Sequence, residues 1–393
     1  MADVLLDDYR WLTSGQADDL LADAASSTEP IVQLTARLRR SLPAGRTHLV
    51  LEQVELRRRA KQKFAHPQRM FFSQVALEQA TDEVLAGYKA ERFGPAGPVA
   101  DLCCGIGGDL LGLAPGRAVL GVDRNPAAAI LASANLRRAL PQEHSCGVAV
   151  ADVLELDLGS AAAWHIDPDR RPHGRRTTRV ALHSPDSAAI DHLRTRCTAA
   201  AIKLAPAAEA PPHWAPEAEL EWISRGRECR QLVVWFDRLA RHAGRRTASI
   251  IAPGSSRTVI ERPDARLPVS PRVQRFVFEP DPAVLAADLS ASLAAEHQLA
   301  ALASRVGYLT GDAAVLDAAL SCFEVLEVLP LRVKLVAQWL RKRGIGQLEI
   351  KKRGVSLEPE QLRRQLRPAG SEQATMLIAP IDGKSVAIMA RRL

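Results

Sequence analysis

The chain divides into three stretches that differ in the spacing of their apolar residues. Residues 1–90 show the three-to-four-residue spacing of amphipathic helices at 5–12, 31–42, 51–64 and from 73 to about 93. Residues 94–280 instead alternate short apolar runs with helical segments, which is typical of a parallel sheet covered by helices on both faces. We therefore predict an α/β fold that is preceded by a helical region.

The pattern is less regular after residue 200. We predict a strand at 219–223, a helix at 228–240, strands at 247–252 and 273–278, and an alanine- and leucine-rich helix at 283–303. Strands at 322–328, 346–352, 374–380 and 385–390, with helices at 330–343 and 359–367, then form a small α+β module of domain size. The predicted domains are residues 1–90, 91–282, a helical linker at 283–310, and 311–393.

A glycine-rich turn follows the first apolar run of the sheet region. Asp101 closes this run, and Cys103, Gly105 and Gly107 come next, before a helical segment. Only glycine lets the backbone turn so sharply and approach a bound nucleoside closely. The spacing fits the nucleoside-binding pattern acidic-x-G-x-G-x-G, with Cys103 at the first glycine position, better than the dinucleotide pattern, whose third glycine is Leu110 here. Asp101, Cys103, Gly105 and Gly107 are therefore candidate cofactor-binding residues.

Three further predicted strands also end in an aspartate. Asp123 ends the run at 118–123 and is placed to accept hydrogen bonds from ribose hydroxyls. Asp152 ends the run at 148–152, where it would contact an adenine ring, and Asp167 lies in the run at 164–168. Open α/β sheets bind ligands at the carboxyl ends of their strands, so we predict that all three line the cofactor site. A helix cap remains the alternative for Asp152.

These residues and several further runs resemble a known family. The glycine turn is similar to the cofactor loop of class I S-adenosylmethionine-dependent methyltransferases. The runs 72–81, 166–171, 183–186, 278–282 and 308–312, in this order, resemble a bacterial family of such enzymes with a C-terminal THUMP-like domain. The resemblance implies a Rossmann-like methyltransferase sheet and S-adenosylmethionine as cofactor. It also implies an RNA substrate, because THUMP domains are associated with tRNA-modifying enzymes.

The residues after the fourth predicted strand are the candidates for the chemistry. Methyltransferases of exocyclic base amines carry Asn/Asp-Pro-Pro and an aromatic residue there, whereas this chain reads Asp167-Pro168-Asp169-Arg170-Arg171. The missing second proline and aromatic ring argue against an amine methylation of that type. We hypothesise that Asp167 orients or deprotonates the acceptor, and that Arg170 and Arg171 bind a phosphate or carboxylate. A structural network of Asp169 with the arginines is the alternative.

The charge of the chain points to nucleic acid. Lysine and arginine number 52 against 45 acidic residues, which gives a net charge of +7 and an isoelectric point near 9.3. The excess lies in three clusters: Arg57, Arg58, Arg59, Lys61, Lys63 and Arg69; Arg170, Arg171, Arg175, Arg176 and Arg179; and Arg341, Lys342, Arg343, Lys351, Lys352 and Arg353. Such clusters neutralise phosphates, so we predict RNA (tRNA or rRNA) as the partner of these clusters and of the C-terminal domain. A solvated helix face is the alternative for each cluster.

Composition favours a globular protein of the cytoplasm. Hydrophobic residues make up 47% of the chain, enough for a packed core. No apolar run approaches the roughly 20 residues of a membrane-spanning helix, and the N-terminus lacks the regions of a signal peptide. The six cysteines show neither a C-x-x-C pair nor histidines at metal-binding spacing, so we predict reduced thiols and no metal site. Cys197 is too remote from the candidate loop to suggest a cytosine C5 mechanism.

Three functions remain compatible with the sequence. The favoured one is an RNA methyltransferase. The second is a non-catalytic assembly factor that keeps a methyltransferase fold and binds cofactor and RNA. The third is a methyltransferase for a small molecule or a protein, whose basic clusters serve solubility only. Salt-sensitive RNA binding separates the first two from the third, and turnover separates the first from the second.

Overall fold

The fold is known from a computed structural model, which describes residues 4–95, 97–140, 145–171, 177–304 and 306–393. Contacts between residues divide the chain into two units. The first unit comprises Met1–Glu219 and Leu232–Gly244, and the second comprises Leu220–Gln231 and Arg245–Leu393. The predicted domains divide the chain elsewhere, at residues 90, 282 and 310.

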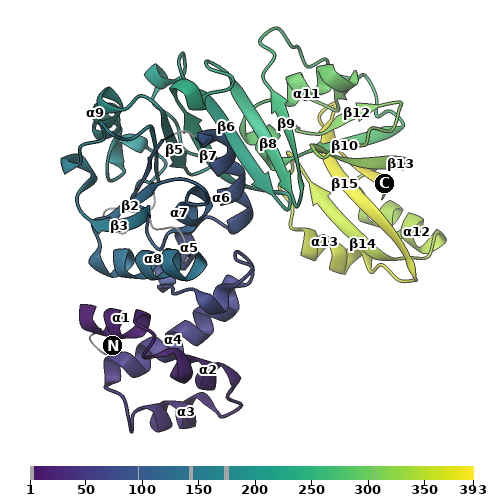
Figure 1. The fold of residues 1–393 in the computed structure, drawn as a ribbon. Coiled ribbons are helices and arrows are strands. Elements are labelled where there is room, and N and C mark those ends of the chain that lie inside the picture. Colours follow the sequence, from purple (N-terminus) through teal and green to yellow (C-terminus); the bar gives the residue numbers. More distant parts are fainter. Residues whose placement is uncertain (1–3, 96, 141–144, 172–176, 305) are drawn as a thin grey trace. The chain divides into compact units, whose positions relative to one another are not determined.

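A parallel sheet forms the centre of the first unit (Figure 1). Its strands are β1 (Val99–Leu102), β2 (Val119–Asp123), β3 (Cys146–Val150), β4 (Ala163–Ile166) and β5 (Ala200–Leu204), in the spatial order β3-β2-β1-β4-β5. All five are parallel, and residues 232–235 pair antiparallel with β5. The direction of winding reverses between β1 and β4, and open sheets bind ligands beyond the carboxyl ends at such a point. The predicted α/β class with a Rossmann-like sheet is confirmed.

Helices connect the strands of this sheet. They are α7 (Gly108–Leu113) after β1, α8 (Pro126–Ala139) after β2 and α9 (Ser187–Arg196) after β4. The start of α8 follows from its first residues, because the side chain of Asn125 accepts hydrogen bonds from the backbone N–H groups of Ala127 and Ala128 and a proline occupies the first helical position. These first residues define where α8 begins.

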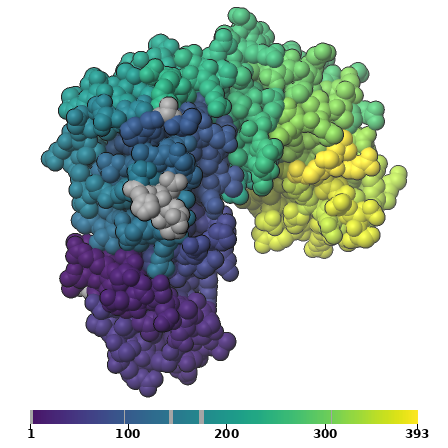
Figure 2. Space-filling view, viewed as in Figure 1, coloured from purple at the N-terminus to yellow at the C-terminus, as the bar shows by residue number. Residues whose placement is uncertain are grey.

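Four N-terminal helices pack on one another and on α8. They are α1 (Leu6–Thr13), α2 (Asp18–Ser26), α3 (Ile31–Leu38) and α4 (Ala44–Ala60), drawn in purple in Figures 1 and 2. Trp11, Leu49 and Phe72 belong to the same buried apolar cluster as Leu131 of α8. The helical region therefore shares a core with the sheet region. Its helical character is confirmed, although α2 was not predicted.

The helix predicted from 73 to about 93 is two helices instead. They are α5 (Gln74–Gln79) and α6 (Glu83–Ala90). The side chain of Asp82 caps α6 by accepting a hydrogen bond from the N–H of Leu85. Lys63 donates hydrogen bonds to the carbonyls of Leu77 and Ala80 at the end of α5. These hydrogen bonds satisfy free backbone groups at the end of α5 and at the start of α6. They therefore stabilise a break between the two helices that the apolar spacing does not reveal.

The helix predicted at 228–240 is wrong as well. The chain forms β6 (Glu219–Arg225) and then β7 (Glu228–Trp235), and only the short helix η6 (Asp237–Leu239) follows. Gly226 and Arg227 between the strands have φ of 61° and 64°, the positive values of a two-residue hairpin turn. The β-branched and aromatic residues at 233–235 also favour a strand. The turn and the strand composition outweigh the helical spacing.

The second unit is rich in strands (Figure 1). β6 pairs parallel with β8 (Arg246–Ala252), which pairs antiparallel with β9 (Ser255–Ile260). A seven-stranded sheet has the order β11-β12-β10-β13-β16-β15-β14. Its strands are β10 (Phe276–Pro280), β11 (Ala300–Ala301), β12 (Leu309–Gly311), β13 (Leu320–Pro330), β14 (Ile345–Lys352), β15 (Glu372–Ile381) and β16 (Lys384–Arg392). The strand predicted at 273–278 thus exists, but it pairs with β12 and β13 and not with the parallel sheet.

Two helices complete the C-terminal module, as the sequence predicts. They are α12 (Val333–Lys342) and α13 (Pro359–Leu366), whose Trp339 and Leu366 share a buried cluster with Met376 of β15. The predicted helix at 283–303 is interrupted, because α10 (Pro282–Ala286) and α11 (Ser290–His297) are separated at Asp288, which has a φ of 55°. Within the described part of the chain, no helix combines the length and apolar character needed to cross a membrane.

Helices α6 and α7 are in backbone contact, and this contact can be tested. A Cβ atom at Gly112 would lie 2.7 Å from the backbone carbon of Ala86, whereas one at Gly87 would meet no atom within 4 Å. We expect Gly112→Ala to lower the free energy of unfolding by about 1–3 kcal/mol through overpacking. The matched Gly87→Ala variant should raise it by about 0.5–1 kcal/mol. Urea denaturation measures both, and equal stability of the two variants would contradict the contact.

Candidate active site

The glycine turn exposes backbone to open space. Cys103, Gly105 and Gly107 have φ of 54°, 56° and 87°, the left-handed region that glycine adopts without strain. Cys103 therefore occupies a conformation that explains why a glycine is usual at its position. A Cβ atom at Gly105 would meet nothing within 4 Å, so the turn is open on that side. The turn can accept a ligand close to its backbone.

Asp123 is joined directly to this turn. Its Oδ2 accepts a hydrogen bond of 2.8 Å from the N–H of Gly105, and its Oδ1 accepts one of 2.8 Å from the N–H of Asn125. Each carboxylate oxygen can accept two hydrogen bonds, so one site on each oxygen is left for a ligand. The carboxylate is half-buried at the end of β2. The structure thus brings Asp123 and Gly105 together, as the sequence predicts.

Asp152 lies exposed beyond the end of β3. Its Oδ1 accepts a hydrogen bond of 3.0 Å from the N–H of Leu154 and caps the short helix η3 (Val153–Glu155). The capping alternative is therefore confirmed. A second carboxylate oxygen is still available, and contact with an adenine ring stays a prediction.

A buried network of charged side chains adjoins the turn. Nδ1 of His165 in β4 donates a hydrogen bond of 2.7 Å to Asp101 in β1, and Nε2 of His165 lies 3.5 Å from Nζ of Lys89 in α6. The ammonium of Lys89 is 2.5 Å from Oδ1 of Asp109, whose Oδ2 accepts a 2.7 Å hydrogen bond from the Thr81 hydroxyl. Asp101 is only 1% exposed. Its predicted contact with a cofactor stays a prediction.

Burial and neighbouring charges shift the pKa values of this network in opposite directions. Burial raises the pKa of Asp101, against the effect of His165, and lowers the pKa of Lys89. Burial opposes ionisation of Asp109 too, but the charges of Lys89, His165 and Lys203 outweigh it and hold the pKa of Asp109 far below its ordinary value. Asp109 is therefore ionised and is the centre of negative charge in the network.

Lys203 extends the network to the end of β4. Its Nζ lies 2.5 Å from Oδ2 of Asp167 and 3.7 Å from Oδ2 of Asp109, and it donates a hydrogen bond of 3.3 Å to the carbonyl of Gln79. Burial lowers the pKa of Lys203, but Asp167 and Asp109 outweigh this effect and raise the pKa overall. Lys203 was not among the predicted site residues, although a lysine inside the apolar run of β5 is a signal that could have identified it.

The arginine-containing loop follows Asp167 without interruption. Its start is fixed by a pair of backbone hydrogen bonds of 2.9 Å each between Asp169 and Ser184. Oδ1 of Asp169 accepts a further hydrogen bond of 2.9 Å from the N–H of Arg171. Nε of Arg171 is enclosed and has no hydrogen-bond partner among the residues that the structure describes. Asp167, Arg170 and Arg171 therefore share one edge of the sheet, while Arg175 and Arg176 lie outside the described residues.

Other predicted basic clusters are partly structural. Arg57 donates a hydrogen bond to the carbonyl of Met70, and burial lowers its pKa to about 10. In the second unit, Lys351 and Arg353 both form ion pairs with Glu279. These side chains stabilise the fold, so fewer basic residues of these clusters are available to a partner than the sequence suggests.

Neither Cys103, in the glycine turn, nor Cys197 is suited to act as a nucleophile in the loop after β4. Burial, together with Asp123 and Asp167, raises the pKa of Cys103, so its thiol stays protonated at neutral pH. Cys197 comes before β5, at the amino edge of the parallel sheet, and its thiol donates a hydrogen bond to the carbonyl of Ala161. This position confirms that Cys197 does not belong to the loop after β4.

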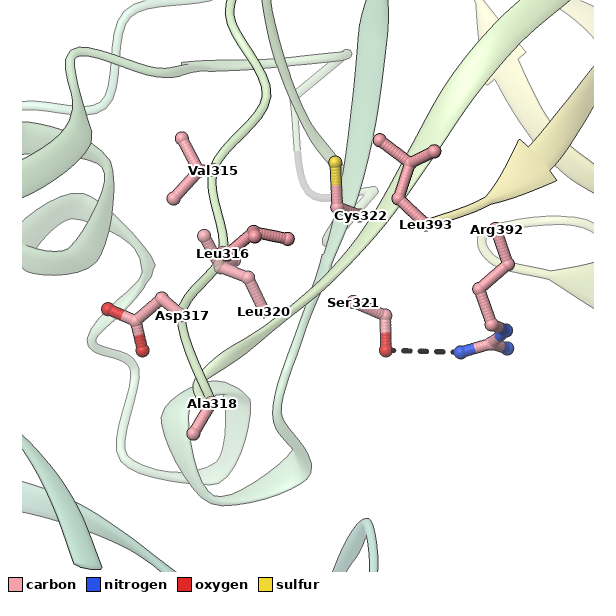
Figure 3. A pocket seen from close by; sticks show the side chains of 9 residues that line it. All are labelled: Val315, Leu316, Asp317, Ala318, Leu320, Ser321, Cys322, Arg392 and Leu393. Atoms are coloured by element: carbon pink, nitrogen blue, oxygen red, sulfur yellow. Dashed lines mark hydrogen bonds between the residues drawn. The ribbon is translucent and has the colours of Figure 1, made fainter.

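A hollow of about 340 Å³ lies in the second unit (Figure 3). It is lined by Val315, Leu316, Asp317, Ala318, Leu320, Ser321, Cys322, Arg392 and Leu393. Its carboxylate, Asp317, accepts a hydrogen bond of 2.9 Å from His297 and pairs with Arg257, which also pairs with Glu296. Arg257 thus neutralises the acidic residues that approach one another there, and we assign no chemistry to this hollow.

Relatives of the chain identify its family. A family model described as THUMP domain-like matches residues 320–392, and one described as a domain of unknown function, DUF8688, matches residues 3–60. Over 349 residues, the chain is 34% identical to an uncharacterized S-adenosylmethionine-dependent methyltransferase found in two strains of Mycobacterium tuberculosis, with 86% of this chain and 94% of that protein covered. The chain belongs to the S-adenosylmethionine-dependent methyltransferases.

The fold of this methyltransferase recurs in a solved structure. A candidate methyltransferase of Porphyromonas gingivalis W83 superimposes with a TM-score of 0.77 at 20% sequence identity, with 100% of both chains covered. The shared fold extends over both units. The predicted family, a methyltransferase with a THUMP-like C-terminal domain, is confirmed.

The buried network makes the stability of the methyltransferase depend on Asp109. We expect Asp109→Asn to lower the free energy of unfolding at pH 7 by about 3–5 kcal/mol, because Lys89 and Lys203 lose their shared carboxylate. The pKa of Asp109 is depressed in the folded state, so its contribution is complete above the ordinary value of 3.8 and is lost as the pH falls below it. Urea denaturation at pH 7, 5 and 3 should show a gap between wild type and variant that narrows only at pH 3.

Asp152→Asn is the matched control, since it also replaces an aspartate but lies exposed and keeps a capping side chain. It should unfold like the wild type at all three pH values. A loss below about 1 kcal/mol for Asp109→Asn at pH 7 would show that the network does not hold the charge pairs that the structure assigns.

Proposed function

We propose that this methyltransferase transfers the methyl group of S-adenosylmethionine to RNA (tRNA or rRNA). In this proposal Asp167 orients the acceptor atom, and Arg170 and Arg171 bind a phosphate beside it. The observation that carries the proposal is the ion pair of Asp167 with Lys203. It holds a half-exposed carboxylate at the carboxyl edge of the sheet, one strand away from the glycine turn.

The residues at the glycine turn fit the cofactor. The left-handed backbone of Cys103, Gly105 and Gly107 and the open space at Gly105 suit a nucleoside lying against the turn. The free acceptor sites of Asp123 suit two ribose hydroxyls. The cofactor supplies an activated methyl group on a positively charged sulfur, and the acidic residues Asp123 and Asp152 at the strand ends favour a cation.

The main task of the protein's own residues is to position the acceptor. Methyl transfer is an in-line displacement, so most of the rate depends on aligning the acceptor atom with the methyl carbon. A carboxylate fixed by a lysine is suited to hold a hydrogen-bond donor of the acceptor. The arginines, whose planar guanidinium groups bind phosphates with two hydrogen bonds, would fix the adjoining nucleotide.

Two observations support RNA as the acceptor. The C-terminal module matches a THUMP domain-like family model over residues 320–392, and the chain carries a net charge of +7. Basic residues such as Arg341 and Lys342 lie exposed in the second unit. Neutralisation of phosphates by such residues releases counterions and makes binding sensitive to salt.

Transfer to RNA is measured directly with labelled S-adenosylmethionine and total RNA from a strain that lacks the gene. We expect incorporation into RNA by the wild type and none by Asp123→Ala. The variant should bind S-adenosylhomocysteine about 10- to 100-fold more weakly in calorimetry, because it loses charged hydrogen bonds to ribose. Asp157→Asn, an exposed aspartate away from the turn, is the control and should behave as wild type.

The alternatives give different results in this experiment. A wild type that binds the cofactor and binds RNA in a salt-sensitive way, yet transfers nothing, would indicate a non-catalytic assembly factor. Cofactor binding without salt-sensitive RNA binding would indicate a small-molecule or protein acceptor. Unchanged cofactor binding by Asp123→Ala would contradict the assignment of Asp123.

Asp167→Asn tests the acceptor side of the proposal. The amide has nearly the same shape but no charge to pair with Lys203, so we expect the rate of methyl transfer to fall about 100-fold. Affinity for S-adenosylhomocysteine should change by less than about threefold, because orientation of the acceptor is the property lost. A full rate in single-turnover measurements would remove Asp167 from the mechanism.

A further inference from the structure

The pairing of Lys203 uses only one oxygen of Asp167. Oδ2 of Asp167 is 2.5 Å from Nζ of Lys203, while Oδ1 receives no hydrogen bond from the residues that the structure describes. The Asp167 side chain is 33% exposed and that of Lys203 is 12% exposed. The lysine is thus at the inner side of the pair, and the carboxylate is the part that a ligand can reach.

Lys203 itself is held from two further directions. Its ammonium lies 3.7 Å from Asp109 and donates a hydrogen bond to the carbonyl of Gln79 in α5. Asp109 is in turn fixed by Lys89 and by the hydroxyl of Thr81. An ammonium with three fixed acceptors has little freedom to move, so it sets the position of the one carboxylate that is half-exposed.

We propose that Lys203 is a positioning residue, which holds Asp167 so that its free Oδ1 binds a hydrogen on the acceptor atom. The methyl acceptor is therefore a group that carries an N–H or O–H bond: an amine, an amide nitrogen or a hydroxyl. A ring nitrogen without hydrogen, or a carbon atom, would leave Oδ1 unpaired. This inference deepens the proposed function and rests on it.

These groups account for each electron pair and for the proton in the methyl-transfer step. The lone pair of the acceptor atom forms the bond to the methyl carbon, and the carbon–sulfur bond breaks with its electron pair remaining on sulfur. The acceptor atom becomes positively charged and its hydrogen acidic. Its proton then passes to Oδ1 of Asp167 and from there to water, so the carboxylate is regenerated. Lys203 stays protonated throughout and keeps the carboxylate in place.

A double-mutant cycle separates positioning from general stability. We expect Lys203→Met to lower kcat for labelled methyl transfer to total RNA at least 30-fold, with the KM for S-adenosylmethionine changed less than about threefold. If Lys203 acts through Asp167, adding Lys203→Met to Asp167→Asn should cause less than about threefold further loss. Losses that multiply in the double variant would overturn the proposal.

Lys89→Met is the matched control. It also removes a buried lysine, whose ammonium lies 2.5 Å from Oδ1 of Asp109. Because Lys89 reaches Lys203 only indirectly, through Asp109, we expect Lys89→Met to lower kcat less than Lys203→Met does. If Lys203→Met fails to fold in thermal melting, Lys203→Gln, which keeps a hydrogen-bond donor without charge, takes its place in the cycle.

The product reveals the acceptor chemistry. Nucleoside digestion and mass spectrometry of the labelled RNA should show a methyl group on an amine, amide nitrogen or hydroxyl. A cationic ring-methylated base or a carbon-methylated base would overturn the inference while leaving the proposed function intact. A wild type that methylates no RNA would refute the proposed function, and the inference would fall with it.

Discussion

The ionised carboxylate of Asp109 is the interaction on which the rest of the site depends. It lies at the start of α7, directly after the glycine turn, and is shared by Lys89 and Lys203. Removing charged groups from water costs several kcal/mol for each ion unless partners compensate for it. Without Asp109, Lys89 would lose its ion pair of 2.5 Å, and Lys203 would depend on its pair with Asp167, which is the more exposed of its two carboxylate partners.

The sheet topology brings these groups together. In the register of β1 and β4, Asp101 lies opposite His165, and in that of β4 and β5, Ile166 lies opposite Ile202. Asp167 and Lys203 each follow one residue later on adjacent parallel strands, so their side chains meet at the carboxyl edge. Backbone contact at Gly112 brings α6, and with it Lys89, against α7. The glycine turn and the loop after β4 are therefore supported by one buried set of charges.

Positively charged residues of this methyltransferase lie in two kinds of environment. Arg57, Lys63 and Lys351 bind backbone carbonyls or a buried glutamate, and contribute to the fold. Exposed residues such as Arg341 and Lys342 have the solvent access that phosphate binding needs. The sequence alone does not distinguish the paired basic residues from the exposed ones, because burial and pairing are properties of the tertiary structure.

The sequence by itself determined the features that depend on local chemistry. The glycine turn, the aspartates at the strand ends, the proline and asparagine at the start of α8, and the elements of the C-terminal module each follow from residues close together in the chain. The helix expected at 228–240 was wrong because a hairpin turn and strand pairing outweighed its apolar spacing. Only the tertiary structure decided that Lys89, Asp109 and Lys203 meet, because the free energy of a buried charge depends on partners that lie far away in sequence.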